Sequence, residues 1–229
     1  MNIAAPLDEL KQMIGFIANP PADGPYHLPV KEVMSNYTGP RDMRMLLECL
    51  NFFECAQNTL ELTEMLEIVR GKHSLLEVGS RLGGTLYKMA EVLAPDSMVV
   101  SVDLPGADGT EKFIDPSGNL HANCGRIALL GHRVQLMLGN SRLPRLIEDV
   151  RKYGPYDFGF IDADHSYEGV RADWETYGPM CLIVGFHDVK NPNEPGCVRF
   201  WNEVKKDYRH QEIFHASEMP LGIGIIYRD

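Results

Sequence analysis

The chain has 229 residues, of which 44% are hydrophobic, and a formal net charge of −10 at pH 7. This length and hydrophobic content suffice for one well-buried α/β domain, and no apolar run approaches the roughly 20 residues of a membrane span. The negative charge argues against a nucleic-acid partner, because phosphate backbones demand clustered Lys and Arg. We therefore expect a small-molecule ligand and neither a membrane nor a nucleic acid as partner.

The cysteines and the first residues predict the compartment. Five cysteines, an odd number, are spread over positions 49, 55, 124, 181 and 197. This spacing favours reduced thiols over a disulfide framework or a zinc site. The opening sequence MNIAAPLDEL lacks the basic and then apolar pattern of a signal peptide. Both features predict a cytoplasmic protein.

Residues 1–70 are predicted to form an N-terminal arm and helical extension. A short helix is expected at about Leu7–Ile17, followed by a proline-rich extended segment that ends at Pro29. Apolar residues then recur at three- and four-residue steps over residues 41–70, which predicts helix with a break near Asn58. These helices could form a homo-oligomer contact, although core packing is the simpler interpretation.

Residues 71–229 are predicted to form the main domain, an α/β, doubly wound, mostly parallel seven-stranded sheet of the Rossmann-like type. Apolar strand segments alternate with helical segments, which is typical of this architecture. A turn is expected at Pro116-Ser117-Gly118. The strands are expected at Leu75–Val78, Met98–Val102, Val134–Leu138, Phe158–Ile161, Leu182–Phe186, Gln211–His215 and Gly222–Tyr227. The helices are expected at Thr85–Leu93, near Leu120–Leu130, from Leu143, at Glu168–Tyr177 and at Glu194–Tyr208.

The first strand leads into a glycine turn, SLLEVGSRLGGT over residues 74–85, that predicts a nucleoside site. Glycine lets a ligand approach the main chain closely. About twenty residues later the second strand ends on Asp103, a carboxylate suited to the ribose hydroxyls. The spacing Gly79-x-x-x-Gly83-Gly84 departs from the dinucleotide pattern G-x-G-x-x-G. The wider turn, with Glu77 before it, favours S-adenosylmethionine, whose amino-acid end carries an ammonium group.

Polar residues follow each of the first five predicted strands. Because ligands of open α/β sheets bind beyond the carboxyl ends of the strands, these residues are the candidate site. Carboxylates and imidazoles gathered after adjacent strands are costly to bury unless they have a role. The residues are Glu77, Asp103, Asn140 with Ser141, Asp162 with Asp164 and His165, and His187 with Asp188.

Five short segments of the chain resemble the class I S-adenosylmethionine-dependent methyltransferases. The chain is similar to the branch that includes macrolide-sugar O-methyltransferases and cephalosporin-hydroxylase-like proteins, over about residues 70–227. Its most specific piece is the run DHSYEG within residues 164–169. The segments are EVGSRLGGT (77–85), VDLPG (102–106), GNS (139–141), FIDADHSYEG (160–169) and FHDV (186–189).

The resemblance implies roles for individual residues. The turn from Gly79 to Gly83 would hold the methionine end of the cofactor, Asp103 the ribose, and Asn140 with Ser141 would lie by the adenine. The full cofactor-binding set expected is Glu77, Gly79, Ser80, Gly83, Thr85, Asp103, Asn140, Ser141 and Asp162. The metal ligands expected are Asp162, His187 and Asp188, with His165 as the catalytic base.

One residue departs from that pattern. His187 stands where metal-binding members place a carboxylate, and imidazole shifts the preference of a site away from magnesium. We expect a divalent cation, Mg²⁺ or Mn²⁺, and the departure at His187 leaves its identity open. For Asp164, capping of the following helix is as good an interpretation as metal binding. His165 and the pair His187-Asp188 could also be ordinary loop residues that bond to backbone.

The predicted function is methyl transfer from S-adenosylmethionine to a hydroxyl of a small molecule, a sugar or a natural product, assisted by a divalent cation. Such a cation and a nearby imidazole would help the hydroxyl lose its proton as it attacks the methyl group. One alternative is a nicotinamide-dependent oxidoreductase, and another is a non-catalytic nucleoside-binding subunit of the same fold.

Overall fold

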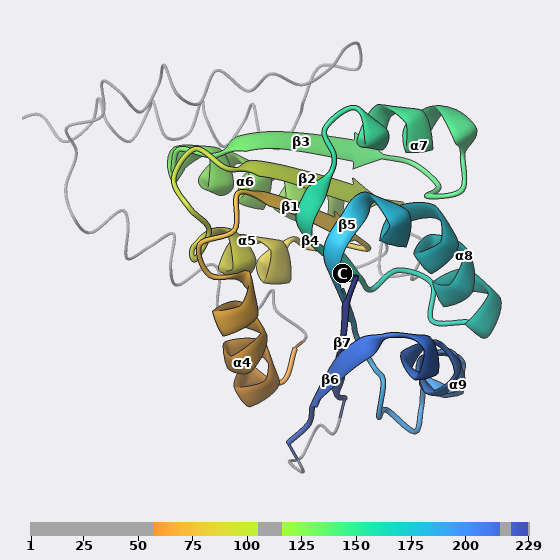
Figure 1. The fold of residues 1–229 in the computed structure, drawn as a ribbon. Helices are drawn as coiled ribbons and strands as arrows, with labels where there is room; N and C mark the ends of the chain where they lie inside the picture. The colour runs from red at the N-terminus through yellow and green to blue at the C-terminus, as the bar shows by residue number, and fades with distance from the viewer. Residues whose placement is uncertain (1–56, 105–115, 216–220, 229) are drawn as a thin grey trace, which may run out of the picture.

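A computed structural model describes residues 57–104, 116–215 and 221–228 of the chain (Figure 1). The predicted helix at Leu7–Ile17, the proline-rich segment and most of the helical extension lie outside the described residues. So does the oligomer contact that those helices could make. Within the described residues no helix is long and apolar enough to cross a membrane.

The core of the fold is one mixed sheet of seven strands in the order β3-β2-β1-β4-β5-β7-β6. The first five strands run parallel, and β7 pairs antiparallel with both β5 and β6. This confirms the predicted Rossmann-like, mostly parallel sheet. The strands are β1 (Ser74–Val78), β2 (Met98–Asp103), β3 (Arg133–Leu138), β4 (Tyr156–Ile161), β5 (Cys181–Phe186), β6 (Arg209–Ile213) and β7 (Ile223–Tyr227).

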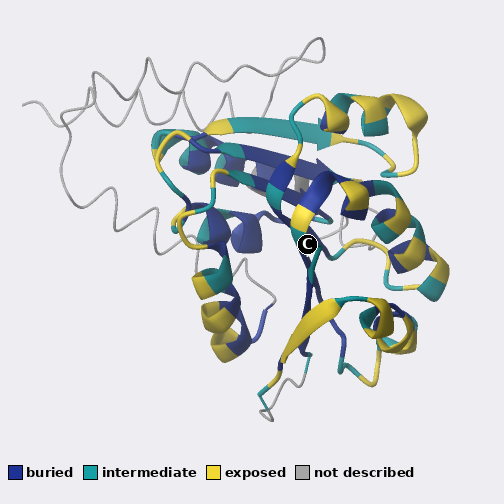
Figure 2. Ribbon diagram, viewed as in Figure 1, coloured by how far each residue is buried: buried dark blue, intermediate teal, exposed yellow. Residues whose placement is uncertain are grey.

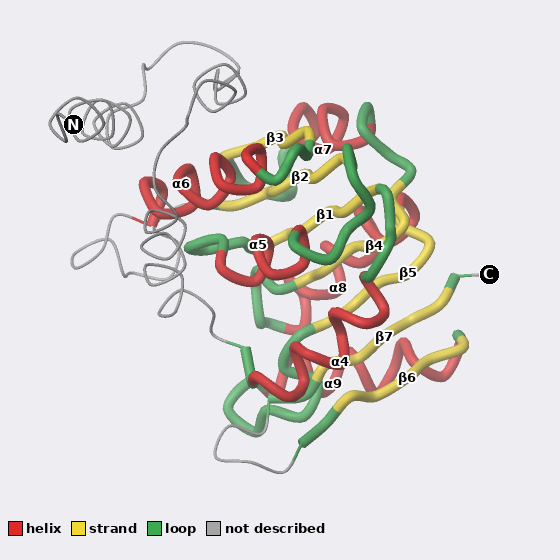
Figure 3. The backbone as a smooth tube through the Cα atoms, turned by 90° about the vertical axis from the view of Figure 1, so that its left-hand side faces the viewer, coloured by secondary structure: helices red, strands yellow, loops and turns green. Residues whose placement is uncertain are grey.

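Helices cover both faces of the sheet (Figure 3). One face carries α4 (Thr59–Val69), α5 (Gly84–Ala90) and α6 (Pro116–Leu129). The other carries α7 (Pro144–Arg151), α8 (Tyr167–Tyr177) and α9 (Pro195–Val204), with short 3-10 turns at Gly178–Met180 and Lys205–Asp207. This arrangement follows from right-handed crossovers between parallel strands, which place successive helices on one face until the strand order reverses.

Two apolar clusters, one on each face, hold the layers together. Alternate residues of β1 enter different clusters: Leu75 packs with α4, α5 and α6, whereas Leu76 and Val78 pack with α7, α8 and α9. This alternation is the two-residue period of a strand that is buried on both faces. The central strands are accordingly buried, while most of β6 is exposed (Figure 2).

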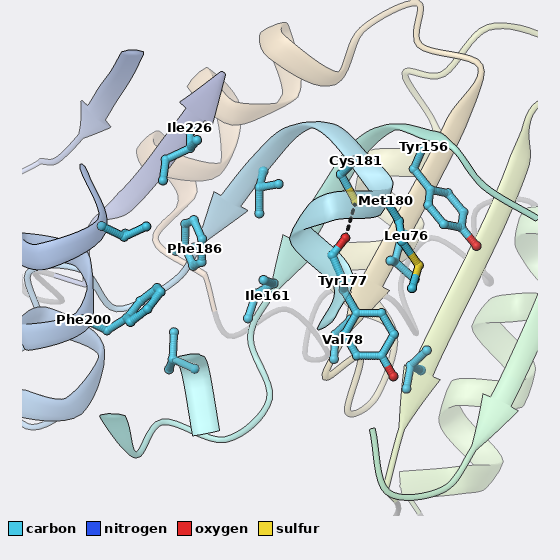
Figure 4. Close-up of a cluster of buried hydrophobic side chains, with 14 of the residues drawn as sticks. Leu76, Val78, Tyr156, Ile161, Tyr177, Met180, Cys181, Phe186, Phe200 and Ile226 are labelled. Atoms are coloured by element: carbon cyan, nitrogen blue, oxygen red, sulfur yellow. Dashed lines mark hydrogen bonds between the residues drawn. The ribbon is translucent and has the colours of Figure 1, made fainter. Parts of the chain in front are cut away.

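The cluster on the α8 and α9 face supports the strand ends that carry the candidate site. Ile161 and Phe186, the last residues of β4 and β5, both belong to it (Figure 4). Trp201 of α9 is fully buried in the same cluster and packs closely against Gly224, where a Cβ atom would lie 2.7 Å from the indole ring. Each large apolar side chain buried in this way stabilises the fold by roughly 1.5–3 kcal/mol.

The structure corrects two predicted boundaries. Pro116-Ser117-Gly118, expected as a turn, begins helix α6, because proline is tolerated in the first turn of a helix, where its missing N–H has no intrahelical partner. The helix predicted to run from Glu194 to Tyr208 is regular only over Pro195–Val204 and ends in a 3-10 turn. The other strands and helices predicted within residues 71–229 lie within a few residues of the observed ones.

Candidate active site

The turn after β1 is fixed to the neighbouring strands on both sides. The amide of Gly79 donates to the carbonyl of Val102 at 2.8 Å, and the amide of Asp162 donates to the carbonyl of Val78 at 2.8 Å. Gly79 has φ +93°, and a Cβ atom there would lie 2.2 Å from the carbonyl oxygen of Asp162. Only glycine fits, so the turn after β1 and the loop after β4 are in direct backbone contact.

Asp103 lies at the end of β2 beside that turn. Its Oδ2 accepts a hydrogen bond from the amide of Arg81 at 2.6 Å, and Arg81 itself has a positive φ of 50°. Gly83, with φ +83°, precedes the first residue of α5. Asp103 is thus held against the turn, and its role as a ribose ligand stays a prediction.

The other residues predicted to bind the cofactor near this turn are buried. Ser80 accepts a hydrogen bond from Ser101 at 2.7 Å, and Thr85 is buried on α5. Glu77 is 1% exposed, and its Oε2 has no hydrogen-bond partner among the described residues. Burial raises the pKa of Glu77 well above its usual range, opposed by a hydrogen bond from Ser80. A buried carboxyl oxygen without a partner is suited to a donor on a bound molecule.

Asn140 and Ser141 form the loop after β3. Oδ1 of Asn140 accepts from the amide of Arg142 at 2.9 Å, and Oγ of Ser141 donates to Oδ1 of Asp173 at 2.8 Å. The hydroxyl of Tyr177 donates to the carbonyl of Ser141 at 2.6 Å. Helix α8 therefore holds this loop, and the loop meets β2 where the amide of Gly139 donates to the carbonyl of Asp103 at 2.7 Å.

Two carboxylates and two imidazoles converge after β4 and β5. Oδ1 of Asp162 lies 3.1 Å from Nδ1 of His187 and 3.3 Å from Nε2 of His165. Oδ2 of Asp188 lies 3.3 Å from the same Nδ1 of His187 and 3.4 Å from Nδ1 of His165. The prediction that strand ends bring these four residues together is confirmed. We call them the acid–imidazole cluster.

Part of this cluster has the dimensions of a metal site. Among the described residues, one ligand atom each from Asp162, His165 and Asp188 lie within 4.8 Å of one another. The sequence predicted His187 as the imidazole ligand and His165 as the base. The geometry adds His165 to the candidates, but His187 turns one nitrogen toward both carboxylates, whereas His165 uses a different nitrogen for each.

The charges of the cluster shift the pKa values of its members. Burial raises the pKa of Asp162, but His187 and His165 outweigh it and hold the pKa at about 2. The hydrogen bond with Asp162, opposed by burial, raises the pKa of His165 to about 9. Burial lowers the pKa of His187, but Asp162 and Asp188 outweigh it and raise the pKa to about 10. The two carboxylates therefore favour the protonated form of each imidazole.

Asp164 lies outside the cluster. Its Oδ1 accepts from the amide of Ser166 at 3.0 Å, and its Oδ2 pairs with Arg142 at 2.8 Å. Ser166 is the residue that caps α8, through its Oγ and the amide of Gly169 at 3.0 Å. Asp164 thus supports the start of α8 and links it to the loop after β3, but the helix cap predicted for Asp164 is Ser166 instead.

Sequence reasoning missed two residues that border the cluster. Glu194 places Oε1 3.5 Å from Nδ1 of His165. Gln57 donates from Nε2 to Oδ2 of Asp162 at 3.0 Å, across 105 positions of the chain. Neither residue lies in a motif, and both reach the site through tertiary contacts, so no local signal marks them.

A comparison with known protein families covers both the glycine turn after β1 and the cluster after β4 and β5. A family model described as a methyltransferase domain matches residues 76–189. The chain belongs to this methyltransferase family. The match begins in β1 and ends just after β5, so it spans the glycine turn and the whole acid–imidazole cluster. A search of curated protein sequences found no match.

Solved structures show the same fold. The methyltransferase chain is similar to an O-methyltransferase from Bacillus cereus in complex with S-adenosylhomocysteine, at 16% identity over 86% of this chain and 96% of that one, with a TM-score of 0.59. It is also similar to cofactor-bound Rv0187 from MTB, at 14% identity over 90% and 98%, with a TM-score of 0.60. A third similar structure is the O-methyltransferase TomG from Streptomyces achromogenes in complex with S-adenosylmethionine. It is 13% identical over 87% of this chain and 95% of that one, with a TM-score of 0.55.

Proposed function

We propose that this methyltransferase transfers a methyl group from S-adenosylmethionine to a hydroxyl of a small molecule, a sugar or another natural product, in the cytoplasm. The observation that carries the proposal is the backbone contact between the turn at Gly79 and the loop at Asp162. It sets the predicted cofactor turn directly beside the acid–imidazole cluster. The O-methyltransferases of the same fold that hold S-adenosylhomocysteine or S-adenosylmethionine support the choice of cofactor.

The chain offers suitable groups for each part of that cofactor. Asp103 would bind the ribose, the turn from Gly79 to Gly83 with Ser80 and Thr85 would hold the methionine end, and Asn140 with Ser141 would lie by the adenine. The buried, unpartnered Oε2 of Glu77 fits a donor such as the cofactor's ammonium group. S-adenosylmethionine supplies a sulfonium-bound methyl group. An oxygen nucleophile would attack the methyl carbon in line, and the neutral thioether S-adenosylhomocysteine would leave.

A divalent cation fits the acid–imidazole cluster. Asp162 and Asp188 would hold it, together with the Nδ1 of His187 that faces both carboxylates. Two oxygens and one imidazole suit Mn²⁺ at least as well as Mg²⁺. When bound, the cation would lower the pKa of a nearby hydroxyl.

His165 would be the proton acceptor. It is one-third exposed on the side chain, whereas His187 is 7% exposed, so a substrate can reach His165 more readily. A base must be neutral before it acts, and the carboxylates raise the pKa of His165, which favours its protonated form. A cation that cancelled their charge would favour the neutral imidazole. Holding the methyl group and the substrate hydroxyl in line beside His165 would supply much of the remaining rate acceleration.

Thermal unfolding with added ligand tests the proposed cofactor. A ligand that binds only the folded state raises the melting temperature. We expect S-adenosylhomocysteine to raise it and NAD to leave it unchanged. A rise with NAD alone would support the oxidoreductase alternative instead. Methyl transfer from labelled S-adenosylmethionine to a panel of sugar and natural-product hydroxyls, with and without a chelator, would then separate an enzyme from a non-catalytic binding subunit.

A further inference from the structure

Gln57 gives the two oxygens of Asp162 different partners. Its Nε2 donates to Oδ2 of Asp162 at 3.0 Å, while Oδ1 of Asp162 faces the imidazoles of His187 and His165 at 3.1 and 3.3 Å. A carboxylate turns as a rigid group, so a partner on one oxygen fixes the direction of the other. Gln57 therefore keeps Oδ1 turned toward the cluster.

The other end of the same amide is buried without a partner. Gln57 is 9% exposed, and its Oε1 has no hydrogen-bond partner among the described residues. A buried carbonyl oxygen left unpaired costs free energy, so such atoms in native proteins usually meet a donor that is bound there. The amide cannot be turned round to remove the problem, because its oxygen would then face the carboxylate of Asp162.

The position of Gln57 is fixed by the start of helix α4. Oδ1 of Asn58 caps the helix by accepting from the amides of Leu60 and Glu61, at 3.0 and 3.3 Å. The carboxylate of Glu61, fully buried, accepts from the amides of His215 and Gly222 at 3.1 and 2.9 Å. The first turn of α4 is therefore tied to the end of the sheet that carries the cluster.

We propose that Gln57 is a positioning residue of the cation site. Its Nε2 orients Asp162, and its Oε1 accepts a hydrogen bond from a water molecule bound to the divalent cation. This inference rests on the cation of the proposed function, and it adds a residue outside the matched region 76–189. Cations such as Mg²⁺ keep several of their waters when one or two carboxylates hold them, which supplies the donor that Oε1 lacks. Residues that orient metal ligands act in this way in other metal sites.

Mn²⁺ binding to the full chain, followed by electron paramagnetic resonance, tests the proposal. Gln57→Met keeps the length of the side chain and removes both hydrogen-bonding groups. We expect it to weaken Mn²⁺ binding by roughly 10- to 100-fold, the usual loss when a residue that orients a metal ligand is removed. Gln57→Asn is shorter by one methylene and cannot reach Asp162, so it should weaken binding likewise while remaining polar. Affinity for S-adenosylhomocysteine should stay at the wild-type value in both variants.

Two controls separate this role from a general effect on stability. Thr59→Ala changes an exposed residue of the same helix, and Val204→Ala removes buried apolar atoms from α9, far along the chain. Both should bind Mn²⁺ as the wild type does. Wild-type Mn²⁺ affinity in Gln57→Met, an equal loss in Val204→Ala, or no Mn²⁺ binding by the wild type would each overturn the proposal. Failure of the wild type to bind S-adenosylhomocysteine would instead count against the proposed function.

Discussion

Asp103 and Asp162 stand at the same level on opposite sides of β1. Val78 pairs with Val102 of β2 and with Ile161 of β4, and each aspartate is the next residue after that partner. Because these strands run parallel, both carboxylates leave the sheet at its carboxyl edge. A nucleoside bound by Asp103, as we propose, would therefore lie at the same edge of the sheet as the acid–imidazole cluster.

Replacement of Gly79 by alanine should destabilise the fold strongly. The new Cβ would lie 2.2 Å from the carbonyl oxygen of Asp162, at a backbone φ of +93°. Overpacking costs typically about 1–3 kcal/mol, in addition to roughly 1–2 kcal/mol for the left-handed backbone. Gly71→Ala is the matched control, since Gly71 has φ +72° with nothing within 4 Å. Urea unfolding measures the free energy of unfolding of both variants. An equal decrease for the two would show that the contact between Gly79 and Asp162 is not tight.

Asp103→Ala should weaken the binding of S-adenosylhomocysteine. Hydrogen bonds to a charged group contribute about 1.5–3 kcal/mol, which corresponds to a loss of roughly 10- to 100-fold in affinity. Asp149→Asn, a change at a half-exposed residue of α7 that pairs with Lys152, should bind normally. Titration calorimetry measures both. Unchanged affinity in Asp103→Ala would remove Asp103 from the cofactor site.

The two imidazoles should differ in their effect on Mn²⁺ binding. His187 turns one nitrogen toward both carboxylates and is buried, so His187→Ala should weaken Mn²⁺ binding. His165→Ala should leave Mn²⁺ bound, because this side chain is proposed to accept a proton and not to hold the cation. Electron paramagnetic resonance would distinguish them. The reverse pattern would exchange their roles and agree with the grouping of Asp162, His165 and Asp188.

Asp173 should make stability depend on pH. Burial raises its pKa from 3.8 to about 6, a rise that the hydrogen bond from Ser141 opposes. A carboxyl whose pKa is higher in the folded state favours folding while it is protonated, and this contribution disappears as the pH rises from about 4 to about 6. Asp173→Asn removes the titration and can still accept from Ser141. Its stability relative to the wild type should therefore rise between pH 4 and pH 7, by up to about 3 kcal/mol.

Urea unfolding at several pH values checks this dependence. A difference between wild type and Asp173→Asn that stays constant from pH 4 to pH 7 would mean that Asp173 does not titrate in this range. The neighbouring Asp164→Asn serves as a comparison, because the pKa of Asp164 is lowered, by Ser166 and Arg142 against the effect of burial.

The sequence predicted the sheet and the strand ends because their signals are local. Apolar runs bounded by glycine mark β1 and β2, and residues that follow parallel strands must meet at one edge. Glu77, Asp103, Asp162, His165, His187 and Asp188 were therefore placed correctly at the edge from sequence alone.

What the sequence could not predict depends on contacts between distant segments. Gln57 reaches Asp162 across 105 positions, and no motif surrounds it. The division of roles between His165 and His187 depends on which nitrogen faces which carboxylate. Pro116-Ser117-Gly118 predicts a turn because proline and glycine are common in loops. Proline is also common in the first turn of a helix, and α6 begins at Pro116.

A nuclear Overhauser measurement on the bound cofactor tests most directly whether its methyl group lies beside His165. Wild-type protein would be saturated with S-adenosylmethionine carrying a ¹³C-labelled methyl group, and transfer to the ring protons of His165 would be recorded, with His165→Ala to assign the signal. We expect a strong effect, because the turn at Gly79 would hold the methyl group beside the acid–imidazole cluster. Bound cofactor without any effect at His165 would contradict it.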